Sequence, residues 1–288
     1  NLKRIHKQIE IYNGDIENEI PIRIIGKKKI DVIYHLAALA DIVPSIENPS
    51  KYMRTNVQGT VNALEFARKV DAKRFIYTAS STCYGLAHEF PTHENSAIDL
   101  QYPYALSKYI GEQIFFHWIN LYKMKGLSLR LFNVYGPRAK TSGQYGAVLG
   151  VFLAQKQASK PLTVVGDGKQ VRDFTYVTDV AKAFYLAGKS KVNSQAINIG
   201  TGNPRSILDL VKILKSTYVN VPKRPGEPNR THSSTQKALD LLNWSANISL
   251  EEGIALTLKD ISFLDDAPVW TPESIDHATK NWFKYLGK

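Results

Sequence analysis

Short apolar runs alternate with longer helical patterns in the first half of the chain. The helical patterns extend from about Asn48 to Val70 and from about Pro103 to Met124. The runs, which are rich in β-branched and aromatic residues, are IEIYN (9–13), DVIYHLAA (31–38), KRFIYTAS (73–80) and LSLRLFNV (127–134). Strands joined by helices of a dozen or more residues are typical of crossover units. The pattern therefore predicts an α/β fold built on a parallel sheet.

The second of these helices is apolar on more than one side. A helix with so wide an apolar surface usually buries two faces. We expect one face to pack on its own sheet and the other on a partner, which predicts a homodimer through the helices near 48–70 and 103–124. The apolar residues are Ile110, Ile114, Phe115, Trp118 and Leu121 on one stripe, widened by Phe116, Ile119 and Tyr122.

After Pro137 the rhythm loosens into short strands and turns rich in glycine and proline, which indicates a smaller region laid over the sheet. Ser206 and Asp209 have the spacing of a capping box, and Thr271 followed by Pro272 predicts the start of a C-terminal helix. In that last helix the sequence shows no residue that we expect to take part in chemistry.

Composition narrows the class of protein. The chain has 288 residues, of which 43% are apolar, enough for one large domain or two smaller ones. No run approaches the roughly 20 apolar residues that a membrane span needs, and the amino end lacks the apolar block of a signal peptide. The single cysteine, Cys83, fits a reducing compartment, so we expect a cytoplasmic protein.

The net charge of +11 has two interpretations. The simpler is a solvated basic surface, and the sharper is attraction to a polyanion or to a small molecule that carries phosphate. The sequence has no helix-turn-helix, zinc-ligand or aromatic-basic RNA pattern, which disfavours nucleic acid as a partner and predicts no metal site.

Tyr104 and Lys108 lie four residues apart at the start of the second predicted helix, in the stretch YPYALSK. Residues with this spacing share one helical face, and a nearby ammonium favours the phenolate form of a tyrosine. The pair is therefore a candidate proton shuttle, or else two surface side chains. Spacing alone does not decide, because Tyr185 and Lys189 repeat it.

A hydroxyl-rich turn supports the first pair. Ser80, Ser81 and Thr82 follow a buried strand, and open parallel sheets bind ligands at the carboxyl ends of their strands. The alternative is that these residues only form the turn, since serine and threonine are common where strands end.

Seven motifs now occur in the order typical of one family. The chain resembles the extended short-chain dehydrogenase/reductases, that is, the NAD-dependent epimerase/dehydratase family, and within it is similar to UDP-glucose and UDP-N-acetylglucosamine 4-epimerases. The resemblance covers about residues 10 to 245. Its motifs are HLAALADIVPSIENPSKYMRTNVQGT, TASSTCYG, YPYALSK, RLFNVYGP, GDGKQVRDFTYVTDVAKA, NIGTGNP and RPGE.

The resemblance implies a Rossmann-like, doubly wound parallel sheet with a smaller α/β substrate-binding region. Residues 1–132 would form the NAD-binding part, and residues 133–288 mainly the substrate-binding part, with 172–199 packing back on the sheet. The glycine-rich fingerprint G-x-x-G-x-x-G, which follows a first strand in this family, does not occur. We therefore expect the sequence to lack the first βαβ portion of the fold, and NAD binding to be weak without it.

The resemblance also implies roles for single residues. Tyr104 would be the catalytic base, Lys108 would hold the nicotinamide ribose and lower the pKa of the tyrosine, and Ser80 would assist at the sugar hydroxyl. The other residues implied to line NAD are Asp15, Ile16, Leu36, Ala37, Ala38, Ala40, Thr55 and Phe132.

On the substrate side, the resemblance implies that arginines hold the diphosphate of a nucleotide sugar, since a guanidinium donates two hydrogen bonds to phosphate oxygens. An ion pair with Asp173 is the alternative role for Arg172. The implied substrate residues are Asn133, Arg172 and Arg224 at the diphosphate, Glu227 at the ribose, and Ser80, Ser81, Thr82, Val148 and Thr231 elsewhere.

Three positions bear on the reaction and the substrate. Ser81 and Thr82 stand where dehydrating or decarboxylating relatives carry acidic residues, which favours 4-epimerisation over 4,6-dehydration, decarboxylation or reduction. Val165 replaces an aromatic residue that commonly stacks on uracil, so the base stays open. Thr231 is small where a bulky residue would exclude an acetamido group, which predicts tolerance of N-acetylhexosamines. A non-catalytic nucleotide-binding homologue is the alternative of a different class.

Overall fold

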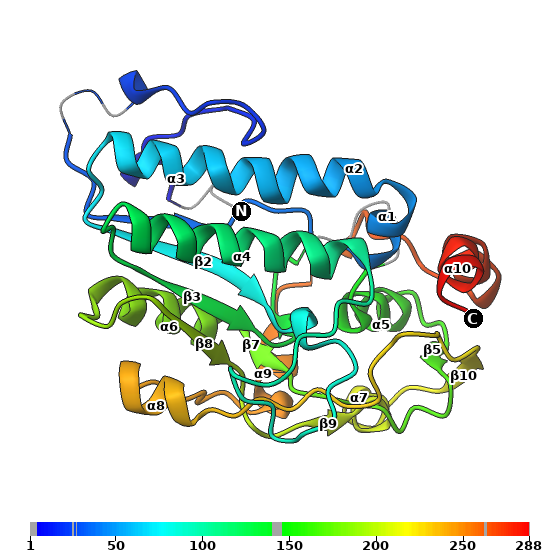
Figure 1. Ribbon diagram of the computed structural model, residues 1–288. Helices are drawn as coiled ribbons and strands as arrows, with labels where there is room; N and C mark the ends of the chain where they lie inside the picture. The colour runs from blue at the N-terminus through cyan, green and yellow to red at the C-terminus, as the bar shows by residue number, and fades with distance from the viewer. Residues whose placement is uncertain (1–4, 25, 27, 140–145, 262–263, 288) are drawn as a thin grey trace.

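A parallel sheet of four strands lies at the centre of the protein. The computed structural model describes residues 5–24, 26, 28–139, 146–261 and 264–287. In spatial order the strands are β1 (Val32–His35), β2 (Arg74–Ser80), β3 (Gly126–Leu131) and β8 (Gln195–Ile199). Helices α3 (Gly59–Lys69) and α4 (Pro103–Leu121) cover one face, and α6 (Val177–Lys189) and α8 (Gln236–Leu242) cover the other (Figure 1). The predicted α/β fold with a parallel sheet is confirmed.

Alternation along β2 explains the two layers. Phe75 and Tyr77 pack on one face with Phe115 and other residues of α3 and α4. Ile76 packs on the opposite face, with Leu127 and further residues of β3, α6 and β8. Successive side chains of a strand point to opposite faces, so a strand buried on both sides has apolar residues in succession, as β2 has from Phe75 to Tyr77.

The helix predicted from about Asn48 to Val70 is present in three consecutive pieces. The Asn48 side chain accepts a hydrogen bond from Lys51 N and begins α2 (Pro49–Tyr52), a π-helical turn spans Met53–Gln58, and α3 ends with Val70 as its C-cap. Helix α4 begins at Pro103 as predicted and ends at Leu121, three residues before the expected end.

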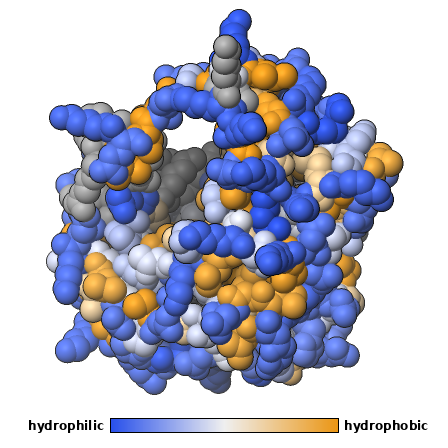
Figure 2. Space-filling view, turned by 90° about the vertical axis from the view of Figure 1, so that its left-hand side faces the viewer, coloured by the Kyte–Doolittle hydropathy of each residue, from blue (hydrophilic) through white to orange (hydrophobic). Residues whose placement is uncertain are grey.

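The strand predicted at residues 9–13 is wrong. These residues form no strand and all are exposed, because no neighbouring strand pairs with them in the described part of the chain. An apolar run becomes a strand only where a backbone ladder can satisfy its N–H and C=O groups. The segment lies above α3 at the top of Figure 1. Figure 2 shows an opening in the upper part of the molecule, seen from the left-hand side of Figure 1.

The second half of the chain adds short strand pairings, of two or four residue pairs each, and helices around a second apolar core. The predicted capping box at Ser206 and Asp209 is confirmed, and so is the helix start at Thr271. The run predicted as a strand at 127–134 is divided, since Asn133 has a positive φ of 29° between β3 and β4. Strands here are β4 (Val134–Tyr135), β5 (Leu162–Val165), β6 (Val171–Arg172), β7 (Thr175–Tyr176), β9 (Arg205–Ser206) and β10 (Tyr218–Val221).

Five further α-helices complete the described ranges, in which no helix is long and apolar enough to cross a membrane. Short 3-10 turns occupy His6–Gln8, Ile22–Ile24 and Ser81–Tyr84. The helices are α1 (Ile42–Glu47), α5 (Val148–Gln157), α7 (Ile207–Leu214), α9 (Leu250–Leu258) and α10 (Pro272–Leu286).

Helix α4 lies so close to the sheet at residue 111 that only glycine, which has no side chain, fits there. A Cβ there would stand 2.3 Å from Tyr77 Oη and 3.2 Å from Thr60 Oγ1.

We predict that Gly111→Ala lowers the free energy of unfolding by roughly 1–3 kcal/mol through overpacking, although alanine has the higher helix propensity. Urea titration measures the change. Tyr77→Phe removes the blocking oxygen, so the double variant should recover part of the loss; equal costs in both backgrounds would contradict the explanation.

Candidate active site

Ser80, Tyr104 and Lys108 lie at the carboxyl edge of the sheet. β2 ends at Ser80, and α4 runs back across the sheet from its N-cap Tyr102, so the first turn of α4 stands beside the strand ends. The Ser80 hydroxyl accepts a hydrogen bond from Thr82 Oγ1 at 2.9 Å. Thr82 and Ser81 belong to the 3-10 turn that follows β2, so the predicted hydroxyl-rich turn is where the sequence placed it.

Tyr104 is partly buried and lies next to Ser80. Burial raises the pKa of the Tyr104 phenol, whereas a side-chain hydrogen bond with Ser80 acts to lower this pKa; Asp41 and Cys83 raise it further. Desolvation therefore has the largest influence on the pKa of Tyr104 in the protein alone, and the role of Lys108 in lowering this pKa stays a prediction.

Lys108 is a buried ammonium with little to compensate its charge. The side chain is 4% exposed, and Nζ lies 4.6 Å from the centroid of the Tyr77 ring. In the described part of the chain its ammonium meets no hydrogen-bond acceptor. Burial lowers the pKa of Lys108 to about 7, although the charge of Glu112, one turn further along α4, acts to raise this pKa.

The second tyrosine–lysine pair is different. Tyr185 is 55% exposed on α6, and Lys189 Nζ lies 4.5 Å from its ring centroid. This pair is an exposed cation–π contact, so burial at a sheet edge distinguishes the first pair where spacing did not.

The residues predicted to line the cofactor come from four segments: a turn before β1, the segment directly after β1, the π-helical turn before α3, and the end of β3. The Asp15 carboxylate accepts a hydrogen bond from Glu17 N at 3.0 Å, and the Ile16 carbonyl accepts one from Asn62 of α3 at 2.9 Å. Thr55 donates to Glu17. Leu36, Ala37, Ala38 and Ala40 occupy the segment directly after β1. Phe132 is 1% exposed, with its ring packed on Tyr84.

Asn56 is a buried polar residue that sequence reasoning missed. Its side-chain oxygen accepts from Leu39 N at 2.8 Å, and its nitrogen donates to Leu39 O at 3.0 Å and to Ser107 Oγ at 2.8 Å. It therefore ties the segment after β1 to α4 beside Lys108. An asparagine inside a long helical pattern was the available signal, since buried polar side chains need partners.

Arg172, Arg224 and Glu227 form an ion-paired cluster in a neighbouring cavity of about 340 Å³. Arg172 donates to Glu227 Oε1 at 2.8 Å, and Arg224 lies 3.8 Å from Glu227 Oε2. That second oxygen is buried and has no hydrogen-bond partner in the part of the chain described. Ala40, Asn133 and Val148 also line the cavity, as do Asp41, Val165 and Trp282.

The alternative role for Arg172 is wrong, because Asp173 is already satisfied. Its carboxylate accepts hydrogen bonds from the backbone or hydroxyl of Thr201, Gly202 and Ser233. With five donors on one carboxylate, Asp173 fastens two loops of the second half together, and Arg172 turns to Glu227 instead.

Asn133 and Thr231 bind each other. Asn133 Nδ2 donates to Thr231 Oγ1 at 2.9 Å and to the Asp173 carbonyl at 3.2 Å. Thr231 Oγ1 also accepts from Asp173 N at 3.1 Å. The amide nitrogen of Asn133, which was expected at the diphosphate, is thus occupied by protein groups.

Two contacts of Tyr52 connect the predicted catalytic residue Tyr104 with the cavity. The Tyr52 hydroxyl donates to the carbonyl of Asp41 at 2.6 Å, and the Tyr52 ring packs edge-on against Tyr104, with centroids 6.4 Å apart. Trp282, from the helix in which the sequence shows no candidate chemistry, lies on the cavity wall. The predicted catalytic residues and the cation-rich cavity therefore adjoin.

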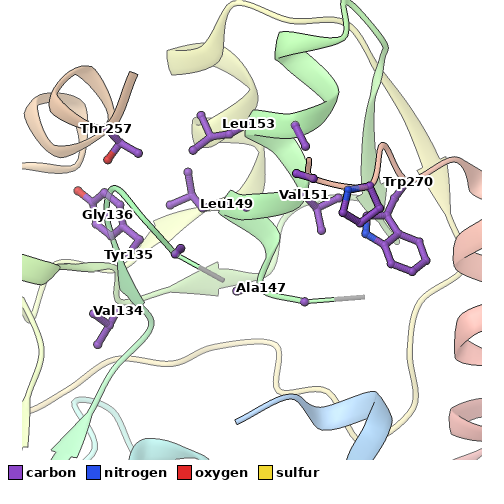
Figure 3. A pocket seen from close by; sticks show the side chains of 15 residues that line it. Val134, Tyr135, Gly136, Ala147, Leu149, Val151, Leu153, Thr257 and Trp270 are labelled. Carbon is purple, nitrogen blue, oxygen red and sulfur yellow. The ribbon is translucent and has the colours of Figure 1, made fainter. Parts of the chain in front are cut away.

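A second, smaller cavity of about 70 Å³ lies on the other side of residues 134–136. Figure 3 shows its lining, which is mainly apolar, with Leu149, Val151 and Leu153 of α5 near Trp270. It contains none of the predicted catalytic or phosphate-binding side chains.

Comparisons with known proteins agree with this arrangement. Residues 1–200 match the model of the family described as NAD dependent epimerase/dehydratase family. A putative UDP-glucose 4-epimerase of Methanocaldococcus jannaschii is 35% identical over 261 residues, covering 88% of this chain and 84% of the relative.

Two solved structures share the fold at similar identity. The UDP-glucose 4-epimerase of Thermotoga maritima, solved with UDP-glucose, has a TM-score of 0.85 and 31% identity over 91% of this chain and 87% of its own. The UDP-glucuronic acid 4-epimerase of Bacillus cereus, solved with UDP-glucuronic acid and NAD, has a TM-score of 0.82 and 29% identity over 91% and 84%. The chain belongs to the NAD dependent epimerase/dehydratase family.

Proposed function

We propose that the protein is an NAD-dependent nucleotide-sugar 4-epimerase that acts on a UDP-hexose or UDP-N-acetylhexosamine. The observation that carries the proposal is the grouping of Ser80, Tyr104 and Lys108 beside a cavity walled by Arg172 and Arg224. A proton-transfer group next to a cation-rich cavity suits a substrate that joins a sugar to a diphosphate.

The residues present fit NAD at its nicotinamide ribose. Lys108 is a buried donor without an acceptor among the described residues, and ribose hydroxyls would supply acceptors. When bound, NAD+ supplies the hydride acceptor, and later the hydride donor, for C4 of the sugar. Asp15, Ile16 and the segment from Leu36 to Ala40 are proposed to line the rest of the cofactor.

Tyr104 takes the proton from the 4-hydroxyl in this proposal and returns it to the 4-keto oxygen at the end of the cycle. Ser80 hydrogen-bonds the same oxygen and favours the phenolate of Tyr104. Rotation of the keto sugar between the two hydride transfers inverts C4. The substrate is neither oxidised nor reduced overall.

The diphosphate end is proposed to rest on Arg172 and Arg224. Glu227 pairs with both arginines in the free protein and offsets one of their two positive charges. Its Oε2, which has no hydrogen-bond partner among the described residues, is an acceptor for a ribose hydroxyl of the nucleotide. Ser81, Thr82, Val148 and Thr231 would border the sugar and nucleotide. The division into a cofactor part (1–132) and a mainly substrate part (133–288) follows from these placements.

The alternatives are weaker on two observations. Ser81 and Thr82 offer no carboxylate for the elimination of a 4,6-dehydratase. A non-catalytic homologue has no use for Lys108, since a buried ammonium with poor compensation costs stability.

We predict that the protein inverts C4 of a UDP-hexose and that Tyr104→Phe abolishes this reaction, because the variant cannot accept the proton. The measurement is ¹H NMR of product after incubation with NAD+ and a panel of UDP-hexoses and their N-acetyl counterparts. Tyr185→Phe, in the exposed pair, is the matched control and should keep full activity. Product lacking the elements of water would support the dehydratase, and turnover of UDP-glucose without its N-acetyl counterpart would contradict the argument from Thr231.

Lys108→Met should lose activity yet gain stability below pH 7. The lysine keeps its charge in the unfolded chain up to about pH 10.4, whereas its pKa in the folded protein is about 7. The unfolded state therefore binds more protons between these values, and wild-type stability rises with pH across that window. The gain from Lys108→Met should be constant below pH 7 and shrink above it, at about 1.4 kcal/mol for each pH unit. Urea titrations at several pH values measure it, and a gain that does not vary with pH would contradict the buried charge.

We further propose a cytoplasmic homodimer through α3 and α4. Leu106, Leu121 and Tyr122 lie exposed on or next to α4, beside the buried residues that pack on the sheet. Exposed apolar side chains on one helix mark an interaction surface. Light scattering should give twice the mass of the chain, and Leu121→Glu should reduce it; a monomeric mass for the wild type would refute the dimer.

A further inference from the structure

Helix α10 lies outside the residues that match the family, yet it packs against the predicted nucleotide site. Figure 1 shows it beside α1, which follows directly on Asp41 of the cavity. Its central residue, Trp282, is 3% exposed. The indole Nε1 donates a hydrogen bond to the carbonyl of Pro225 at 2.7 Å. The helix is therefore fixed to the backbone between Arg224 and Glu227.

The face of the same indole holds Arg224. The guanidinium carbon lies 5.6 Å from the Trp282 ring centroid, within the range of a cation–π contact. On another side, Arg224 meets Glu227 at 3.8 Å, and its side chain is only 11% exposed. One tryptophan thus fixes both the backbone that carries Arg224 and the guanidinium itself.

Trp282 also reaches the start of the catalytic helix. The Tyr102 ring, which belongs to the N-cap of α4, packs against Trp282 with centroids 6.2 Å apart. Two residues later comes Tyr104. The indole therefore links the arginine of the predicted diphosphate site to the turn that presents the catalytic base.

We propose that Trp282 is a positioning residue for nucleotide binding, which orders Arg224 so that its guanidinium is presented to the diphosphate. This inference rests on the proposed function for the identity of the ligand. An unsupported arginine has many rotamers to lose when it binds a phosphate, and a stacked one has fewer. The C-terminal helix then determines nucleotide affinity without contributing to the chemistry at C4.

The test is binding of UDP by isothermal titration calorimetry, which requires no cofactor or turnover. Trp282→Phe keeps an aromatic ring but removes the indole N–H and weakens the cation–π contact. We expect UDP to bind roughly tenfold more weakly, the size of effect typical of one charge-assisted hydrogen bond. The KM for the UDP-sugar should rise in proportion while kcat is unchanged. Trp270→Phe, in the smaller apolar cavity before the same helix, is the matched control and should bind UDP as the wild type does.

A double-mutant cycle separates positioning from a merely structural role. If Trp282 acts through Arg224, then adding Trp282→Phe to Arg224→Lys should cost much less than tenfold. Additive losses, a fall in kcat with unchanged UDP affinity, or wild-type UDP binding in Trp282→Phe would each overturn the inference. Trp282→Tyr serves as a second variant should Trp282→Phe fail to fold.

The outcomes distinguish this inference from the proposed function. UDP binding that depends on Trp282 in a protein without epimerase activity would support the inference and refute the function. Epimerase activity with UDP affinity independent of Trp282 would do the reverse. Failure of the wild type to bind UDP would refute both.

Discussion

The buried ammonium of Lys108 is the constraint on which the rest of the site depends. A charge in so dry a place is stable only because its surroundings are held rigidly. The Tyr77 ring lies beneath Nζ, and the Tyr77 hydroxyl donates to the Lys108 carbonyl at 2.9 Å. Glu112, one turn on, is held by Arg130 at 2.7 Å and by Ser128 at 2.6 Å. The same contacts that pack α4 on the sheet therefore also hold the charge of Lys108 in place.

The other end of the site is assembled from distant parts of the chain. Arg172 comes from β6, Arg224 and Glu227 from a loop about fifty residues later, and Trp282 from the last helix. Asp173, next to Arg172, holds the surrounding loops with five accepted hydrogen bonds. Each of these contacts joins residues far apart in sequence. The proposed substrate-binding cluster thus depends on tertiary packing, whereas the proposed catalytic pair lies within one helical turn.

This difference explains what the sequence could predict. The start of α4 and the helical face shared by Tyr104 and Lys108 follow from local spacing, and the structure has both as predicted. The strand at residues 9–13 was wrong because strand formation requires a partner, which periodicity within one segment does not supply. The alternative ion pair of Arg172 with Asp173 is absent for the same reason. Arg172 pairs instead with Glu227, which is distant in sequence and is brought near only by the fold. Trp282 and Asn56 were missed because their roles lie entirely in such distant contacts.

Two polar groups at the site that have no hydrogen-bond partner among the described residues would favour a ligand that supplies a partner to each. Lys108 Nζ lacks an acceptor, and Glu227 Oε2 lacks a donor. Each costs free energy in the free protein and releases it only to a ligand with the matching polar group in reach. A ligand that offers one group recovers only part of the cost. Hydroxyl-bearing ribose rings at both ends, one on the cofactor and one on the substrate, would recover all of it, so the same unsatisfied atoms that lower stability favour the pair of nucleotides over either alone.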